Sequence, residues 1–310
     1  MRRGAVVVLG VFAADVTFRA DRLPAIGETL LGRSFALGPG GKGSNQAVAA
    51  GRAGAEVRML TRIGRDPFGD MAMGVWTEAG VGTDAVIRAE AATGAAFIYV
   101  DDATGDNAII VAPGAAGALS AGDAEGWSDL IGAAAVFVTQ LEQPLDAALR
   151  ALEIARAGGA TTLLNPAPAA ALPEGMLAFC DYVTPNESEA EALTGVAVRD
   201  MAGARAAGDA LLALGVRRAA VLTLGERGAL FHAADRSVHV PAMPAGAVVE
   251  TTGAGDAFNG GFATALAEGR DPMEAARFAC AVAGLSVTRA GAAAAMPARG
   301  EIDAAMARDA

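Results

Sequence analysis

Short aliphatic runs alternate with longer alanine-rich stretches along most of this chain. The runs are typical of buried strands, and the longer stretches have the length and composition of helices. This alternation predicts an α/β fold in which a mostly parallel sheet is covered by helices on both faces. The expected strands are residues 5–9, 57–61, 135–139, 161–165, 182–185, 219–223 and 229–232, and the expected helices are residues 44–53, 67–78, 145–157, 187–193, 201–214, 257–268 and 272–288.

Two segments break the alternation. Residues 16–35 have no helical period, and residues 95–111 read as a β-hairpin with a polar turn. Such β segments within an α/β chain suggest a small sheet that flanks a site. We therefore expect one domain over residues 1–310, with a small β subdomain from about residues 12–37 and 93–112.

The segment Glu250-Thr251-Thr252-Gly253-Ala254-Gly255-Asp256 leads into an expected helix. Glycines at a helix start let backbone N–H groups converge, and the helix dipole adds positive potential, which suits a phosphate group. A carboxylate there would repel phosphate unless it takes part in the reaction. Asp256 is therefore the expected proton acceptor of a small-molecule kinase. The alternative is an ordinary helix N-terminus with Asp in its first turn.

A second glycine cluster, Gly38-Pro39-Gly40-Gly41-Lys42-Gly43-Ser44-Asn45-Gln46, lies upstream. It fits G-x-G-x-x-G, but the dinucleotide fingerprint belongs in the first strand–helix turn, which here is residues 10–15. A P-loop is excluded because glycine follows Lys42. What remains is a backbone-lined surface with one ammonium and one amide, which suits the hydroxyls of a polyol.

Together these two segments resemble the signatures of the ribokinase, or pfkB, family of sugar kinases. The resemblance extends almost end to end, through Gln140-Leu141-Glu142 and residues 27–29, 165–168, 184–189 and 223–228. It implies a ribokinase-like fold whose small sheet is a lid over the sugar and commonly a dimer interface. The implied activity is transfer of the ATP γ-phosphate to a primary hydroxyl of a pentose-type sugar by a homodimer.

The resemblance also implies roles for single residues. Asp256 would accept the proton of the attacking hydroxyl, and the amides of Gly253, Ala254 and Gly255 would hold the transferring group. The implied sugar-binding residues are Asp15, Gly41, Lys42, Asn45 and Glu142. The implied nucleotide-binding residues are Asn186, Glu189, Thr223, Gly225 and Gly228. Taken alone, Asp15 is equally a turn residue, Glu142 a loop carboxylate, and residues 223–228 a hairpin turn.

Two cation sites follow from the same resemblance. Asn186 and Glu189 would orient the phosphates and a hydrated Mg²⁺, which favours oxygen ligands and retains several waters. The alternative for this pair is an N-cap Asn with a solvated Glu. Glu250 matches the position of a carboxylate near a monovalent cation, K⁺, but relatives usually have Asp there and Ser where this chain has Ala295. These departures argue against a strong K⁺ site.

Composition limits the function classes. A formal net charge of −11 argues against general affinity for nucleic acid or for an anionic membrane surface. Cys180 and Cys280 have no metal-ligand or redox spacing, so we expect two reduced, buried thiols. No apolar run approaches the length of a membrane span. We expect a cytoplasmic protein whose small-molecule partners are a sugar and ATP.

One departure concerns the sugar itself. Ala13 stands where ribokinases usually have a sugar-contacting Asn, and its methyl group forms no hydrogen bond. The change favours a sugar that lacks the corresponding hydroxyl or carries a carbon group there. Three hypotheses therefore stay open at this point: a ribokinase-type pentose kinase; a kinase of the same fold for a deoxy-sugar, ketohexose or nucleoside; and a non-catalytic sugar-binding regulator.

Overall fold

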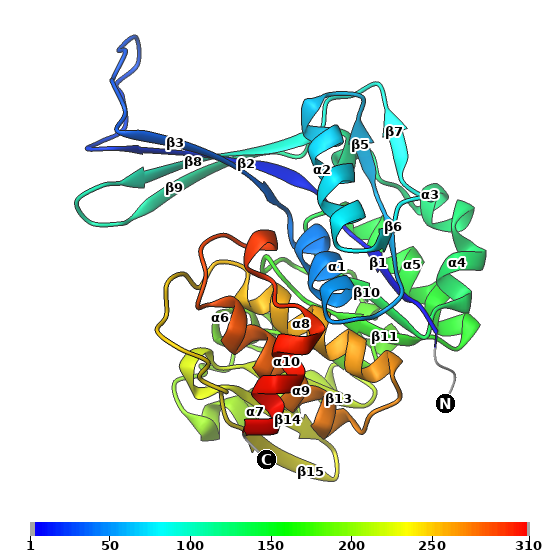
Figure 1. The fold of residues 1–310 in the computed structure, drawn as a ribbon. Coiled ribbons are helices and arrows are strands. Elements are labelled where there is room, and N and C mark those ends of the chain that lie inside the picture. The colour runs from blue at the N-terminus through cyan, green and yellow to red at the C-terminus, as the bar shows by residue number, and fades with distance from the viewer. Residues whose placement is uncertain (1–3, 309–310) are drawn as a thin grey trace.

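The computed structural model describes residues 4–308, and a nine-stranded sheet runs through its centre (Figure 1). The strand order is β15-β14-β13-β12-β11-β10-β1-β4-β6. Every pair from β6 to β13 is parallel, while β14 and β15 are antiparallel additions at one edge. The strands are β1 (Val6–Leu9), β4 (Val57–Leu60), β6 (Val81–Gly82), β10 (Val136–Thr139), β11 (Thr161–Leu164), β12 (Tyr182–Val183), β13 (Ala219–Thr223), β14 (Ala229–Ala233) and β15 (Arg236–Val240). The expected mostly parallel sheet is confirmed.

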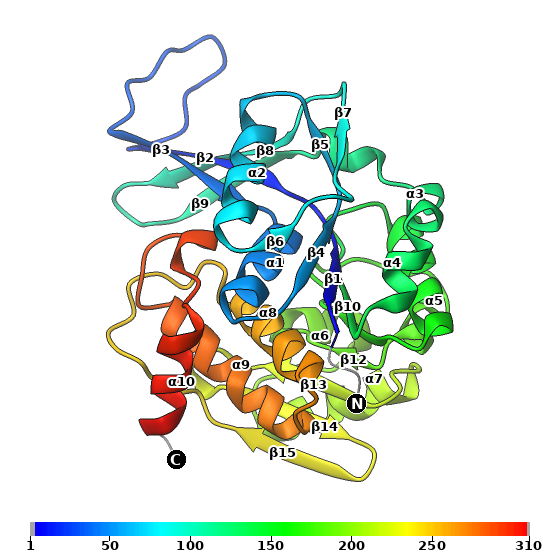
Figure 2. The same cartoon turned by 45° about the vertical axis from the view of Figure 1, so that its right-hand side comes forward.

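Helices cover both faces of this sheet, as Figure 2 shows. Successive residues of β1 belong to opposite cores: Val6 and Val8 pack in one hydrophobic cluster, and Val7 and Leu9 pack in the other. A strand that is buried on both faces explains its unbroken apolar sequence. The first core is covered by α1 (Lys42–Arg52), α2 (Pro67–Glu78), α8 (Ala254–Ala267), α9 (Pro272–Ser286) and α10 (Arg299–Arg308). The second is covered by α3 (Ala121–Gly126), α4 (Ser128–Ala133), α5 (Leu145–Gly158), α6 (Glu187–Thr194) and α7 (Met201–Ala213).

A separate four-stranded sheet projects from this body (Figure 1). Its order is β3-β2-β8-β9, formed by β2 (Ala13–Ala20), β3 (Ser34–Gly40), β8 (Gly94–Asp101) and β9 (Asn107–Ala112). This is the small sheet expected from the N-terminal segments, and we call it the lid sheet. A two-stranded sheet of β5 (Arg62–Gly64) and β7 (Ile87–Ala89) lies between the lid sheet and α3 (Figure 1).

Several boundaries differ from the expectations. Helix α8 begins at Ala254 rather than residue 257, and α1 begins at Lys42 rather than residue 44. The glycine segment is thus the first turn of α8 itself. The β character expected for residues 16–35 is confirmed at both ends of the segment, where β2 ends at Ala20 and β3 begins at Ser34. The expectations missed the helices α3, α4 and α10 and the strands β5, β6, β7 and β15. Among residues 4–308, no helix is long and apolar enough to span a membrane.

Candidate active site

The site lies where the parallel strands end. The residues after β10, β11 and β12 include Gln140, Asn165 and Thr184, and the N-termini of α1 and α8 meet them there. Ligands of open α/β sheets bind outside the carboxyl ends of the strands, so the topology places polar side chains from distant segments together.

Asp256, the third residue of α8, is the buried carboxylate at this convergence. Its Oδ2 accepts a hydrogen bond from Asn45 Nδ2, and its Oδ1 accepts one from Gln46 Nε2, both at 3.0 Å. Burial raises the pKa of Asp256 above its usual value, while the charge of Lys42 and the two amide donors oppose this rise. The helix carries the carboxylate, and α1 fixes its orientation.

The residues expected to bind the sugar gather around the start of α1. Glu142 accepts a hydrogen bond from the backbone N–H of Lys42 at 2.7 Å. Gly41 is the N-cap of α1 with φ of 88°, and a Cβ there would lie 2.6 Å from the carbonyl oxygen of Val11, so this position requires glycine. Asp15, on the lid strand β2, lies beside Gly40.

The pKa values of two carboxyl groups in this cluster, Asp15 and Glu142, are raised. Burial, and to a smaller extent the charge of Asp256, raises the pKa of Asp15 to about 6. Burial raises the pKa of Glu142 to about 7, although the N–H and charge of Lys42 oppose the rise. Both carboxyl groups therefore titrate close to neutral pH.

The glycine segment forms the N-terminus of α8, where backbone N–H groups are exposed to an incoming ligand. Gly253 is the N-cap in the left-handed region, with φ of 77°. The N–H of Ala254 donates to the carbonyl of Thr251 at 3.1 Å, so this one of the three expected amides already has a partner. Within residues 4–308, the N–H groups of Gly253 and Gly255 have no protein acceptor. These two amides are the ones free to bind an anion.

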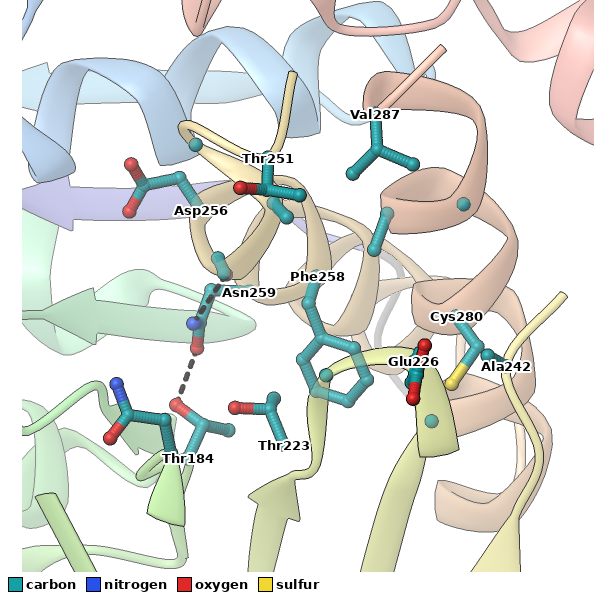
Figure 3. A pocket seen from close by; sticks show the side chains of 18 of the residues that line it. Thr184, Thr223, Glu226, Ala242, Thr251, Asp256, Phe258, Asn259, Cys280 and Val287 are labelled. Atoms are coloured by element: carbon teal, nitrogen blue, oxygen red, sulfur yellow. Dashed lines mark hydrogen bonds between the residues drawn. The ribbon is translucent and has the colours of Figure 1, made fainter. Parts of the chain in front are cut away.

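A cavity of about 520 Å³ extends from Asp256 and Lys42 along α8 (Figure 3). All the residues expected near the nucleotide line it, namely Asn186, Glu189, Thr223, Gly225 and Gly228. The sequence reasoning missed its far wall, which consists of residues 242–246 and 248 and of Cys280, Ala283, Gly284 and Val287 in and after α9. These residues are mostly small and apolar, so they give no chemical signal in the sequence.

Asn186 and Glu189 form a capping box at the start of α6. The Asn186 side chain accepts from the Glu189 N–H at 2.8 Å, and the Glu189 carboxylate accepts from the Asn186 N–H at 2.9 Å. The N-cap interpretation of Asn186 is therefore confirmed, but Glu189 is buried rather than solvated. Burial raises the pKa of Glu189. Only one of its oxygens takes part in the cap, and the pair lines the cavity.

Other expectations have clear structural outcomes. Gly225 and Gly228 do lie in the turn of the β13–β14 hairpin and Thr223 ends β13, and all three residues line the cavity. The Glu250 carboxylate accepts a hydrogen bond from the Gly291 N–H at 2.8 Å. Cys180 and Cys280 are free and buried, as expected. No cluster of three or more His, Cys, Asp or Glu residues suited to a metal ion occurs in the described residues.

The sequence and the structure were compared with those of known proteins. Residues 4–299 match the family described as pfkB family carbohydrate kinase. A ribokinase from Schizosaccharomyces pombe is 36% identical over 307 residues, which cover 96% of each chain. A deoxyribokinase from Salmonella typhi is 37% identical over 288 residues, which cover 92% of this chain and 93% of that protein. The structure of Arabidopsis thaliana ribokinase complexed with ribose and ATP matches with a TM-score of 0.91 and 29% identity over 99% of each chain.

Proposed function

This chain belongs to the pfkB family of carbohydrate kinases, and from that premise we propose that it transfers the γ-phosphoryl group of ATP to a primary hydroxyl of a pentose-type sugar. The observation that carries this proposal is the place of Asp256. It is a buried carboxylate in the first turn of α8, between the polar group around the start of α1 and the 520 Å³ cavity.

The proposed reaction uses these parts in sequence. The sugar is held by Asp15, Asn45 and Glu142, whose oxygens and amide suit vicinal hydroxyls. Its reacting oxygen gives its proton to the Asp256 carboxylate as it bonds to the γ-phosphorus, and ADP leaves with the electron pair of the broken P–O bond. The free amides of Gly253 and Gly255, at the positive end of α8, stabilise the negative charge on the transferring group.

The nucleotide is proposed to occupy the cavity. Its phosphates would lie toward Lys42 and the start of α8, and its base toward the apolar wall formed by residues 242–246 and α9. A Cβ at Gly284 would collide with the carbonyl oxygen of Met243, so glycine lets this wall approach α9 closely. An apolar wall with polar groups at one end suits a flat base joined to a charged phosphate chain.

The sequence suggests sites for Mg²⁺ and K⁺, and the side chains of the structure fit Mg²⁺ better than K⁺. Glu189 is a buried residue with one carboxylate oxygen outside its capping bond, which fits a hydrated Mg²⁺ that would neutralise phosphate charge. Glu250 already accepts the Gly291 N–H, and buried Ala295 offers no side-chain oxygen, so the side chains fit K⁺ poorly. We therefore propose that Mg²⁺ is required and that K⁺ activates weakly.

A second candidate substrate is a deoxy-sugar. The ribokinase and the deoxyribokinase compared above have nearly the same identity to this chain, so identity favours neither sugar. Ala13 favours the deoxy-sugar, because it is buried, lies on the same face of β2 as Asp15, and places a methyl group where an amide would bind a hydroxyl.

We also propose that the lid sheet forms a homodimer interface. Phe18, Phe35, Phe97 and Ile110 share the face of the sheet opposite to Asp15, and they are 39%, 57%, 37% and 69% exposed. The rings of Phe18 and Phe35 lie 5.2 Å apart. An exposed apolar face of this kind marks an interaction site, and a second copy of the same face would cover it.

The function is tested by measuring ADP release with ATP, Mg²⁺ and a panel of ribose, 2-deoxyribose, fructose and adenosine. A pentose or deoxypentose should give the highest kcat/KM. Turnover with fructose or adenosine alone would show that the substrate is a ketohexose or a nucleoside and not a pentose. Silence with every acceptor, combined with calorimetric binding of a pentose, would instead favour a non-catalytic sugar-binding protein.

A further inference from the structure

Gln46 lies at a junction of buried amide groups beside Asp256. It is 1% exposed, and all its side-chain polar atoms have partners. Its Oε1 accepts from Gln140 Nε2 at 2.6 Å. Its Nε2 donates to Asp256 Oδ1 and to Asn165 Oδ1, both at 3.0 Å. One side chain of α1 therefore joins the ends of β10 and β11 to the carboxylate of α8.

The neighbours of Gln46 fix which end of its amide faces Asp256. Asn165 uses its Nδ2 to donate to the carbonyl of Thr184 at 3.1 Å, which turns its oxygen toward Gln46. Gln140 presents its nitrogen to the Gln46 oxygen. If the Gln46 amide were flipped, its oxygen would face the oxygens of Asp256 and Asn165, and its NH₂ group would face the NH₂ group of Gln140. Such contacts are costly in a buried network. The N–H end of Gln46 is thus held against the carboxylate.

We propose that Gln46 is a positioning residue for phosphoryl transfer, whose amide keeps the Asp256 carboxylate ionised and in one orientation beside the sugar hydroxyl. The inference rests on the proposed role of Asp256 as the proton acceptor. Gln46 binds one carboxylate oxygen and Asn45 binds the other, so together they set the plane of the group. Each oxygen keeps a further lone pair that can accept the proton of the sugar.

The charges around Asp256 explain why this donor matters. Lys42 favours the ionised form, whereas the nearby carboxylates Asp15, Glu142 and Glu189 repel it. Asp256 is buried, so water stabilises its charge little. Loss of the Gln46 donor should raise the pKa of Asp256, and the base would then be protonated over more of the working pH range.

The test compares Gln46→Met with Gln143→Met. Gln143 is the matched control because it is also a buried glutamine, only 3% exposed. Its amide donates to Thr139 Oγ1 and to the carbonyl of Gln140, and it forms no hydrogen bond with Asp256. Both variants lose one buried amide and gain the same side chain. For each, kcat and both KM values are measured from about pH 5.5 to 9, with ATP, Mg²⁺ and the sugar of highest kcat/KM for the wild type.

We expect Gln46→Met to lower kcat by about 10–100-fold, while both KM values change by less than about threefold. The acidic limb of its kcat profile should move upward by about one pH unit. Loss of a charge-assisted hydrogen bond to the ionised form changes the pKa of a carboxyl group by about one unit. Gln143→Met should keep the wild-type profile. A lowered kcat with an unmoved acidic limb, or the same change in both variants, would overturn the inference by showing a merely structural role.

Asp256→Asn is measured beside them to separate the two proposals. If it retains near-normal kcat, the proposed role of Asp256 fails. If it is inactive while Gln46→Met behaves as the wild type, only the inference about Gln46 fails. Should Gln46→Met not fold, Gln46→Glu preserves the shape and places a second carboxylate against Asp256. The pair would share a proton, and kcat should fall by more than about 100-fold. Wild-type kcat in Gln46→Glu would overturn the inference.

Discussion

Half-buried Asp15 and Glu142 and fully buried Asp256 lie in one group of carboxylates, and the charge of Lys42 acts on Glu142 and Asp256. Asp15, Glu142 and Asp256 each have a raised pKa, and burial is the largest cause in every case. Before a sugar binds, their ionisation costs free energy because neither water nor a close cation fully stabilises them. The site is therefore under electrostatic strain in the free protein, and hydroxyl donors of a bound sugar would relieve it.

This strain predicts a pH dependence of stability. The pKa of Glu142 is raised from 4.5 to about 7, so its contribution to stability is complete below about pH 4.5 and is lost as the pH rises through about 7. Glu142→Gln does not titrate. In the ligand-free protein, the Tm of Glu142→Gln minus that of the wild type should increase by several degrees from about pH 5 to pH 8.

The control is Glu78→Gln, which changes an exposed carboxylate at the end of α2. Its Tm difference from the wild type should stay flat over the same range. A flat difference for Glu142→Gln as well, measured by calorimetry, would mean that the Glu142 carboxyl titrates in the folded protein as it does in the unfolded chain.

Ala13 gives a second prediction about a single residue. If its methyl group excludes a hydroxyl-binding amide, the wild type should prefer 2-deoxyribose to ribose in kcat/KM. Ala13→Asn should then shift the ratio toward ribose by about 2–10-fold, the range of one hydrogen bond. The exposed lid position Ala36→Asn should leave the ratio unchanged. A wild type that prefers ribose, with no shift in Ala13→Asn, would mean that water fills the gap.

Helices α1 and α8 carry most of the proposed machinery, and they cross in close contact. A Cβ at Gly260 would lie 2.5 Å from the Cβ of Ala49 and 2.7 Å from the carbonyl oxygen of Gln46. Backbone atoms cannot move aside as flexible side chains can. The crossing therefore sets the distance between Asp256 on one helix and its two amide donors on the other.

Gly260→Ala should accordingly separate these helices and lower both stability and kcat. We expect a loss of about 1–3 kcal/mol in the free energy of unfolding, measured by urea denaturation. Gly74→Ala is the matched control, because Gly74 lies in α2 with open space around its Cβ position. It should be neutral or stabilising by about 1 kcal/mol. Equal effects of the two changes would contradict a tight α1–α8 contact.

Elements with a simple periodic signal could be predicted from the sequence, and elements that depend on distant partners could not. Strand β1 is apolar throughout because both its faces are buried, so it was expected from its sequence alone. Strand β2 alternates less regularly and pairs with β8, some 80 residues away, which no local pattern encodes. Strand β15 is an exposed edge strand with polar residues.

The same distinction holds within the site. Asp256 and the residues of the glycine segments were identified because charged groups and glycines are unusual in such positions. The cavity wall that contains Ala283 and Gly284 could not be predicted, because small apolar residues form it and contribute only the shape of the cavity. The motif around Gln46 predicts no role for its side chain, since its partners Gln140 and Asn165 lie more than 90 residues away in the chain.

At the scale of the whole molecule, the apolar lid face predicts a dimer. Wild-type protein should have twice the mass of the 30.8 kDa chain in light scattering after size exclusion. Ile110→Glu should give the mass of a single chain, because it places a charge on the exposed apolar face of the proposed interface. Leu214→Glu, at an exposed apolar position at the end of α7, should remain dimeric. A monomeric wild type would refute the interface.

In the proposed function, the α/β body and its lid bring a sugar hydroxyl, a nucleotide and the Asp256 carboxylate together. The most direct test measures turnover and ligand binding in Asp256→Asn. The variant keeps the size of the side chain but removes the proton acceptor, so sugar and ATP should bind with near wild-type affinity by calorimetry, while kcat falls by about 10²–10⁴-fold. Near-normal turnover in Asp256→Asn would contradict the account.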